Sequence, residues 1–228
     1  NRGGTLHSDG SSTLTVTVDG LLDNSAQGTV SSGGSAHITA HSLDNQAGTV
    51  AAGAALQLDA ATQVRNTGGL IQAGTDLRAA SNGLDNHSGR IIAGTVDLDT
   101  RGYTLDNRAG TVASLTGGAT LHSGLLDNSG GLLQSAGGMR IDTSGQALIT
   151  TDANGNGLNS GGTLDINSGA FDNRGGPVFA HGALPLPASP VATTAGGALV
   201  GPTALPLPPH SLRHARRRLT LGPHAAIT

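Results

Sequence analysis

The sequence predicts an all-β protein that folds as a parallel β-helix, a solenoid built from coils of about 21 residues. Three observations predict this class: a short motif recurs at that interval, apolar residues alternate within each interval, and the composition disfavours other classes. The 228 residues include 37 glycines but no cysteine or tryptophan, and aromatic residues make up only 1%. Large rings normally fill a wide globular core, and the chain has no Glu or Lys to favour exposed helices. We therefore expect a narrow interior.

The recurring motif is Leu-Asp-Asn, and its asparagines set the period. From Asn24 to Asn128 the successive anchors are 21, 21, 20, 21 and 21 residues apart, a spacing typical of solenoids. The anchors are Asn24, Asn45, Asn66, Asn86, Asn107, Asn128 and Asn173, and Asn1 fits as an earlier one. The last gap, from Asn128 to Asn173, spans 45 residues. It predicts one coil without the motif and an irregular stretch near 149–160, so that about eight coils occupy 1–182.

Each interval holds three short strands. An aliphatic residue follows the asparagine by five positions and a small residue by seven, as Val50 and Ala52 do after Asn45, and this alternation places both on one face. A second inward pair follows, such as Leu56 and Leu58. Because strands this short are unstable alone, we expect each to pair with its equivalent one coil later, at roughly 4.7 to 4.9 Å. The stack would form a rod about 40 Å long.

The motif itself predicts an internal ladder. Alternation points Leu and Asn inward and Asp outward, and a buried amide needs hydrogen-bond partners, which stacked asparagines can supply to one another. The glycine three residues later is expected to supply a corner with positive φ, which a Cβ would penalise. These corner glycines are Gly48, Gly69, Gly89, Gly110, Gly131 and Gly176, with Gly28 one position late.

Five segments together carry a family resemblance: "LDNSAQGTV", "LDNQAGTVAAG", "LDNHSGRIIAG", "LDNRAGTVAS" and "LDNSGGLLQSAG". Through them the chain, from about Asn1 to Gly182, resembles the haemagglutinin repeats of filamentous haemagglutinin-like exoproteins, the secreted partners of two-partner secretion. The resemblance implies a right-handed β-helical rod on a bacterial surface. The sequence contains neither the secretion domain nor the toxin domain of such exoproteins, so we expect a fragment whose export signals lie elsewhere.

The predicted function is that of a structural shaft segment in a secreted surface adhesin, without an active site or cofactor. The implied partners are an outer-membrane transporter during export and a receptor or glycan on a host or neighbouring cell. Two alternatives stay open: the stalk of a contact-dependent growth-inhibition toxin, and a carbohydrate-active β-helix enzyme. The net charge of −3 and pI near 6.3 do not fit a protein that coats nucleic acid, and no apolar run reaches the roughly 18 residues of a membrane span.

Candidate chemical groups are few. The exposed aspartates of the motif would form a row along one edge that could hold calcium or line a sugar groove, although Arg65 interrupts it. His37 and His41 lie four residues apart on an expected strand and corner, and we expect no metal site there. The sequon Asn86-His87-Ser88 contains a ladder asparagine and is expected to be accidental. No Ser-His-Asp or phosphate-binding arrangement is recognisable. The aspartates are Asp23, Asp44, Asp85, Asp106 and Asp127.

The remaining residues, 183–228, do not repeat. They contain "ALPLPASP", "ALPLPPH" and "RHARRR" (Arg213 to Arg218), a low-complexity composition rich in Pro and Ala. Proline at this density disfavours ladder hydrogen bonds. We expect a disordered tail that acts as a linker, with an anion-binding role for the arginines as the alternative.

Overall fold

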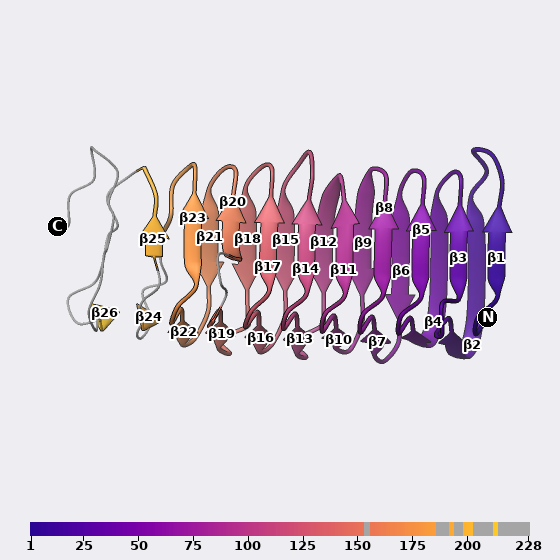
Figure 1. Cartoon of the computed structure of the whole chain (residues 1–228), viewed down its shortest axis with the longest axis horizontal. Helices are drawn as coiled ribbons and strands as arrows, with labels where there is room; N and C mark the ends of the chain where they lie inside the picture. Colours follow the sequence, from indigo (N-terminus) through magenta and orange to yellow (C-terminus); the bar gives the residue numbers. More distant parts are fainter. Residues whose placement is uncertain (153–155, 186–191, 194–197, 203–211, 214–228) are drawn as a thin grey trace.

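The computed structural model is an elongated stack of β-coils through which the chain winds from one end to the other (Figure 1). It describes residues 1–152, 156–185, 192–193, 198–202 and 212–213. All regular structure in this part of the chain is strand, and neighbouring strands pair in parallel, each with its equivalent in the next coil. The predicted parallel β-helix is confirmed. Within the same residues there is no helix of the length and apolarity needed to cross a membrane.

The first face of the rod is a ten-stranded parallel sheet. It begins each coil directly after the asparagine motif, and its register is continuous: Val50 pairs with Ile71, and Ile91 with Val112. In order along the rod its strands are β1 (Thr5–Ser8), β3 (Thr29–Ser32), β5 (Thr49–Ala52), β8 (Leu70–Ala73), β11 (Arg90–Ala93), β14 (Thr111–Ser114), β17 (Leu132–Ser135), β20 (Gly157–Ser160), β23 (Pro177–Ala180) and β25 (Ala198–Val200).

The second and third faces form one 16-stranded sheet, joined through the long strands β2 (Leu14–Asp23) and β4 (Ala36–Asp44). The second face comprises β6 (Leu56–Ala60), β9 (Asp76–Ala80), β12 (Thr95–Asp99), β15 (Ala119–His122), β18 (Met139–Asp142) and β21 (Leu164–Asn167). The third face comprises β7 (Val64–Arg65), β10 (Leu84–Asp85), β13 (Leu105–Asp106), β16 (Leu126–Asp127), β19 (Leu148–Ile149), β22 (Phe171–Asp172), β24 (Ala192–Thr193) and β26 (Leu212–Arg213).

Two kinds of corner between the faces differ in how strictly they repeat. The corner that leads from the third face to the first contains the motif asparagine, and we call it the asparagine corner. The corner that leads from the second face to the third differs between coils, and we call it the variable corner. In β4 the second and third faces run together without a break, so that coil has no separate variable corner.

The interior is a set of columns of like side chains, one per inward strand position. The column at the start of the third-face strands contains Leu43, Val64, Leu84 and Leu105, all buried, and continues to the buried Phe171. Most strands of four residues alternate between buried and less buried positions, as β5 and β18 do. Because each apolar side chain lies on its equivalent above and below, a rod this thin buries its core without large rings.

The coils depart from regularity at the corner after β19. Leu132 and Gly157 are paired and so occupy equivalent positions in neighbouring coils. Leu132 follows Asn128 by four positions, whereas Gly157 follows Thr150 by seven, so the corner after β19 holds three extra residues. Residues 153–155 of the expected irregular stretch lie outside the described residues.

Pairing continues beyond residue 182. β25 pairs with β23 through Leu199 and Val178, β24 pairs with β22, and β26 pairs with β24. Leu184 and Leu199 are both buried. Most of 183–228 lies outside the described residues, and of the arginine-rich run only Arg213, in β26, lies within them. The boundary at 182 and the disordered tail therefore stay predictions.

Candidate functional site

The motif asparagines form one hydrogen-bonded column along the rod. In each step Nδ2 of one asparagine donates to Oδ1 of the next, over 2.6 to 2.7 Å, and the motif residues from Asn24 onward are fully buried. The second proton of each amide goes to backbone carbonyls: Asn45, for example, donates to the oxygens of Gly48 and Leu70. The six bonds run from Asn1 through Asn24, Asn45, Asn66, Asn86 and Asn107 to Asn128.

The asparagine corner is a tight turn that the motif closes with its own atoms. The Gly48 N–H donates to the carbonyl oxygen of Asn45, and Oδ1 of Asp44 accepts a bond from the Gln46 N–H. The aspartate is thus a turn cap, because a short carboxylate can accept the N–H two residues on. The same cap is present at Asp23, Asp85, Asp106, Asp127 and Asp172.

The expected positive φ of the corner glycines is wrong. The left-handed residue lies one position earlier and is often not glycine: Ala47, Ser88 and Ala109 have φ between 52° and 54°. The corner glycines are required for a different reason, the close approach of two coils. A Cβ on Gly89 would overlap the carbonyl oxygen of Asn66 and lie 2.6 Å from Oδ1 of Asn86. In the corner after Asn24 one extra residue shifts the glycine to Gly28, and both Ala26 and Gln27 then have positive φ.

The ladder changes where the motif is lost. Thr150 occupies the asparagine position, fully buried, and its hydroxyl donates to Oδ1 of Asn173 over 3.0 Å. Asn128 keeps its bonds to the carbonyl oxygens of Gly131 and Gly157. Nδ2 of Asn173 has no acceptor among the described residues, and residue 194, which follows β24 in the sequence, lies outside them.

The variable corner alternates between short and long turns. In the coil of β6 it starts at buried Ala60, four positions before Val64. In the five coils from β9 to β22 it starts at a buried hydroxyl residue, and in the first four of these the backbone N–H of that residue donates to the carbonyl oxygen just before the equivalent residue of the next coil. From that residue to the apolar residue of the third face is three positions in the short turns and five in the long ones. The starting residues are Ser81, Thr100, Ser123, Thr143 and Ser168. The two long turns share a conformation: Arg101 and Gly102 have φ of 51° and 79°, and Ser144 and Gly145 have 52° and 76°.

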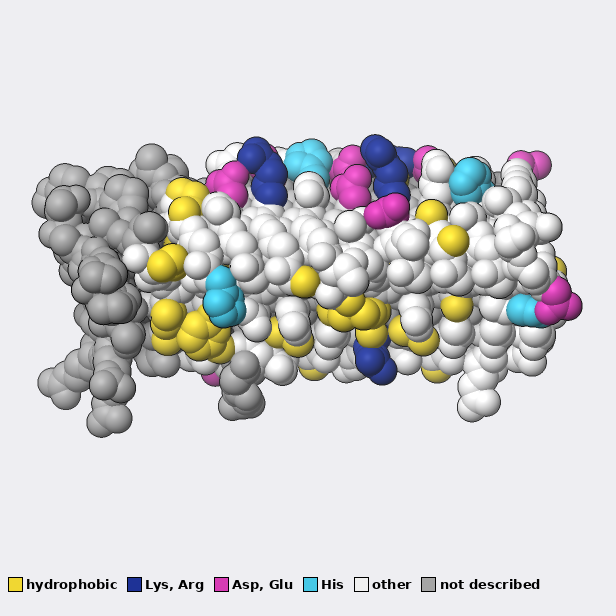
Figure 2. All heavy atoms as spheres, turned by 90° about the horizontal axis from the view of Figure 1, so that it is seen from above, with side chains coloured by type: hydrophobic (Ala, Val, Ile, Leu, Met, Phe, Trp, Pro, Cys, Tyr) yellow, Lys and Arg dark blue, Asp and Glu magenta, His cyan; other side chains and the backbone are white. Residues whose placement is uncertain are grey.

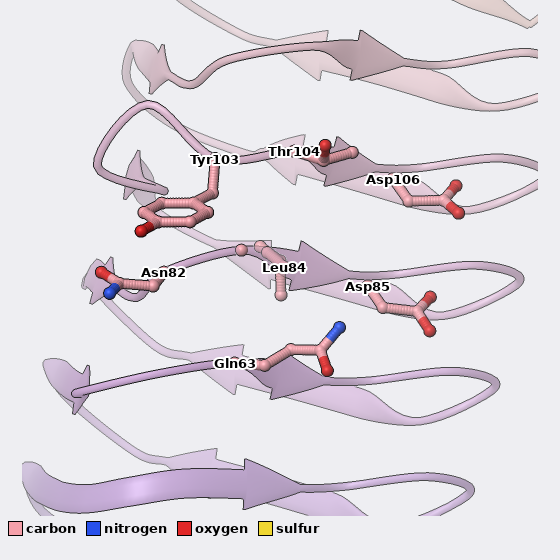
Figure 3. A pocket seen from close by; sticks show the side chains of 8 residues that line it. Gln63, Asn82, Leu84, Asp85, Tyr103, Thr104 and Asp106 are labelled. Atoms are coloured by element: carbon pink, nitrogen blue, oxygen red, sulfur yellow. The ribbon is translucent and has the colours of Figure 1, made fainter.

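One long turn lifts an aromatic ring onto the surface. Tyr103 follows Gly102 and is 55% exposed, and its ring points toward the coil that contains Asn82 and Leu84 (Figure 3). Beneath it is a groove of about 320 Å³ whose walls include Gln63, Asn82, Asp85 and Asp106. No signal in the sequence points to this groove, because its residues come from three coils and the ring is isolated in the chain.

Arg101 anchors that turn. Its guanidinium reaches back two coils and donates to Oδ1 of Asp59 over 2.7 Å and to the carbonyl oxygen of Ala60 over 3.0 Å. On the other side of the turn Gly124 donates its N–H to the Tyr103 carbonyl oxygen. A Cβ on Gly124 would overlap the Gly102 carbonyl oxygen. The short corner next to the turn therefore needs a residue without a side chain at this position. The position of Tyr103 is therefore fixed by its neighbours on both sides.

Comparison with known proteins is decisive about the family. The model of the haemagglutinin repeat matches residues 1–27, 7–103, 91–151 and 147–200, which together span most of the chain. The chain belongs to the haemagglutinin repeat family. No curated protein and no solved structure matches the chain significantly. The repeats that the family model matches are the coils described above, and the last match extends to β25.

The aspartates of the haemagglutinin repeats form the expected row, since Asp23 pairs with Asp44 and Asp85 with Asp106 in register. Arg65 interrupts the row and lies 3.4 Å from Asp44. Burial raises the pKa of Asp106, but hydrogen bonds from the side chain and backbone of Arg108 outweigh it, and the pKa lies below its ordinary value. The row consists of turn caps and surface ion pairs, and among the described residues no group of three or more ligating side chains could hold a metal ion.

The histidine pair and the sequon occupy ordinary positions of the repeats. His37 and His41 are both exposed on β4. His87 and Ser88 of the sequon lie in an asparagine corner, and Asn86 is a fully buried member of the ladder. Asp, Arg and His side chains gather along one edge of the rod in Figure 2. Ion pairs also join coils of the second face, such as Arg140 with Asp165 over 2.8 Å.

Stacking of the repeats also brings together a set that the sequence did not show. Oγ of Ser144 lies 3.2 Å from Nε2 of His122, and Nδ1 of His122 lies 3.1 Å from Oδ1 of Asp99. The order is that of a nucleophilic triad. However, the His122 and Asp99 side chains are 47% and 45% exposed, and none of the three lines the Tyr103 groove. Nucleophilic catalysis also needs oxyanion donors and a site that excludes water, so we assign no reaction to them.

Proposed function

We propose that this chain is a shaft segment of a secreted bacterial surface adhesin, in which the stacked repeats hold contact surfaces away from the cell. Membership of the haemagglutinin repeat family and the rod of parallel coils support a structural, adhesin-like shaft. With ten strands on the first face, the rod is roughly 43 Å long at the usual strand spacing. Export through an outer-membrane transporter is part of the same proposal.

The asparagine ladder, unbroken from Asn1 to Asn128, is the observation that carries the proposal. The motif that defines the repeat joins one coil to the next: Leu fills the core, Asp caps the turn and Asn continues the ladder. The most regular part of the sequence therefore encodes length and stiffness. Binding is left to side chains that differ between coils.

The Tyr103 groove favours a binding surface over the enzyme alternative. Glycoside hydrolysis needs two carboxyl groups, one of which keeps its proton near neutral pH because its pKa is raised. The pKa of Asp106 is shifted in the opposite direction. Asp106 is also held by the guanidinium of Arg108 over 2.6 Å.

The adhesive role can be tested with beads coated with the 228-residue chain and washed over cultured epithelial cells or over bacterial lawns. We expect beads with the folded chain to be retained several-fold better than beads with the same chain unfolded by heat. Small-angle scattering of the free chain should give the profile of a rod. Retention no greater than for the unfolded chain would remove the adhesive part, and a compact sphere or a helical circular dichroism spectrum would remove the shaft.

A further inference from the structure

We infer that the groove beneath Tyr103 is a binding site for a neutral, uncharged oligosaccharide, which lies along the third face of the rod. The site rests on the proposed adhesive function and gives it a ligand chemistry. Three features point to it: the exposed ring of Tyr103, the planar polar groups around the ring, and the charge of the groove.

The ring of Tyr103 is exposed at a position where the fold does not require it. The chain has one tyrosine and two phenylalanines, and Phe171 is buried in the core. Tyr103 is instead 55% exposed, on a long turn held by Arg101 and packed against Gly124. The second long turn, with the same φ angles to within a few degrees, carries Gln146 in the equivalent place. An aromatic residue there is therefore not needed to form the turn.

The polar lining of the groove suits a sugar. Gln63 and Asn82 offer amides that can both donate and accept, and Asp85 and Asp106 offer carboxylate oxygens. In Figure 3 Asn82 lies next to the ring on the neighbouring coil, and Gln63, Asp85 and Asp106 lie further along the third face, on three successive coils. A sugar ring has one apolar C–H face and a rim of hydroxyl groups. An aromatic face with a few convergent polar groups matches both of these features.

The charge of the groove disfavours anionic ligands. Asp85 and Asp106 line it. The carboxylate of Asp106 is paired with the guanidinium of Arg108 and that of Asp59 with Arg101, whereas Asp85 has no ion-pair partner among the described residues. A sulfated or sialylated glycan would place its anions beside Asp85. Like charges a few ångströms apart disfavour such a complex, so the groove selects neutral sugars.

The groove also continues along the rod, which favours an extended chain over a single sugar. A second hollow of about 140 Å³ shares Gln63 and is lined further by Leu21, Ser42, Asp44 and Arg65. Leu21 is 56% exposed. From Leu21 to Tyr103 the strip crosses five coils, or roughly 19 Å at the usual strand spacing. An oligosaccharide of several units can follow such a strip.

A peptide fits less well. Peptides that bind to sheets usually add a strand at an open edge, and along the sides of this rod the backbone groups are paired with the coils above and below. A basic peptide that prefers the two carboxylates is the competing outcome in the test.

The experiment uses the whole 228-residue chain and a printed array of neutral, sialylated and sulfated oligosaccharides, followed by calorimetry with the best ligand. Because the chain has one tyrosine and no tryptophan, its intrinsic fluorescence reports on the groove alone. We expect neutral glycans to bind at least tenfold better than their sialylated or sulfated forms, and to change the tyrosine fluorescence.

The decisive variant is Tyr103→Gln, which places the residue of the equivalent long turn in the groove and should fold normally. It should weaken binding at least tenfold, whereas Tyr103→Phe should keep most of it. Leu115→Ala, at an exposed leucine outside the groove, is the matched control and should bind like the native chain.

Several results would overturn the inference: no neutral glycan bound, equal or better binding of anionic glycans, unchanged affinity in Tyr103→Gln, or tighter binding of a basic peptide. The bead experiment separates this failure from that of the proposed function. If Tyr103→Gln beads still adhere as well as native beads, the glycan site is wrong and the adhesive shaft stands. If native beads do not adhere while the purified chain binds sugar, the adhesive function is wrong and the glycan site stands.

Discussion

The asparagine corner and the variable corner of the same coils follow opposite rules. The asparagine corner repeats almost unchanged, because a fully buried amide, a capped turn and a glycine without room for a Cβ depend on one another in the coils that carry the full motif. The variable corner needs only a small buried residue at its start, such as Ala60, Thr100 or Ser123, and then spans three, four or five positions to the apolar residue of the third face. Sequence repetition thus marks the places where buried polar groups must be satisfied, while contact surfaces develop where it lapses.

The largest effect is expected from breaking the ladder at its centre. Asn86→Ala removes the donor to Oδ1 of Asn107 and the acceptor for Nδ2 of Asn66. Since each buried polar group left without a partner costs about 1 to 3 kcal/mol, we expect a loss of about 3 kcal/mol in the free energy of unfolding. Urea unfolding measures it. The neighbouring exposed variant His87→Ala should stay within about 0.5 kcal/mol of the native chain, and equal midpoints for the two variants would contradict the ladder's role.

The next effect compares two glycines of the asparagine corner. Gly89→Ala forces a Cβ against the Asn66 carbonyl oxygen. In Gly68→Ala the new Cβ meets nothing within 4 Å, and the alanine only has to adopt the left-handed conformation that Ala47 and Ala109 already have. We expect a loss of about 2 to 3 kcal/mol for Gly89→Ala and about 1 kcal/mol for Gly68→Ala. Thermal and urea unfolding would give the order. A larger loss at Gly68 would restore the positive-φ explanation.

A repair of the ladder should have a smaller effect, in the stabilising direction. Thr150→Asn would offer Asn128 an Oδ1 acceptor and would still donate to Asn173. One additional buried hydrogen bond contributes about 1 kcal/mol, so the unfolding midpoint should rise. Thr151→Asn, at the adjacent, less buried position, is the control and should leave it unchanged. A lower midpoint for Thr150→Asn would show that the longer corner after β19 cannot accept an asparagine.

The smallest effect is expected in acid and involves both corners. Hydrogen bonds lower the pKa of Asp106 against the opposing effect of burial, and the Ser144 N–H lowers the pKa of Asp142 at a variable corner. A carboxyl whose folded pKa is depressed stabilises the fold above its unfolded value, ~3.9, and this contribution is lost as pH falls through the folded pKa. Stability should therefore decrease below about pH 4. Asp106→Asn and Asp142→Asn should each flatten the profile, and an unchanged profile in both would contradict the turn-cap role.

The sequence was sufficient to predict the repeating part of the molecule. The period, the three strands, the inward Leu and the asparagine ladder all follow from side chains that recur in phase, as at Asn45, Asn66 and Asn86. The φ of the corner glycines was predicted wrongly because clash and backbone conformation select the same residue, and only the structure separates Gly48 from the left-handed Ala47. The Tyr103 groove and the cluster around His122 could not be predicted, since they join residues of different coils that no motif links.

The ladder also makes the two ends of the rod electrically different. All six side-chain bonds donate in the same sense, from Asn1 toward Asn128, so the amide dipoles add head to tail, while those of the strands largely cancel. Each amide polarises the next. A column of aligned dipoles inside the rod gives it a permanent moment along its axis, which an applied field should be able to orient.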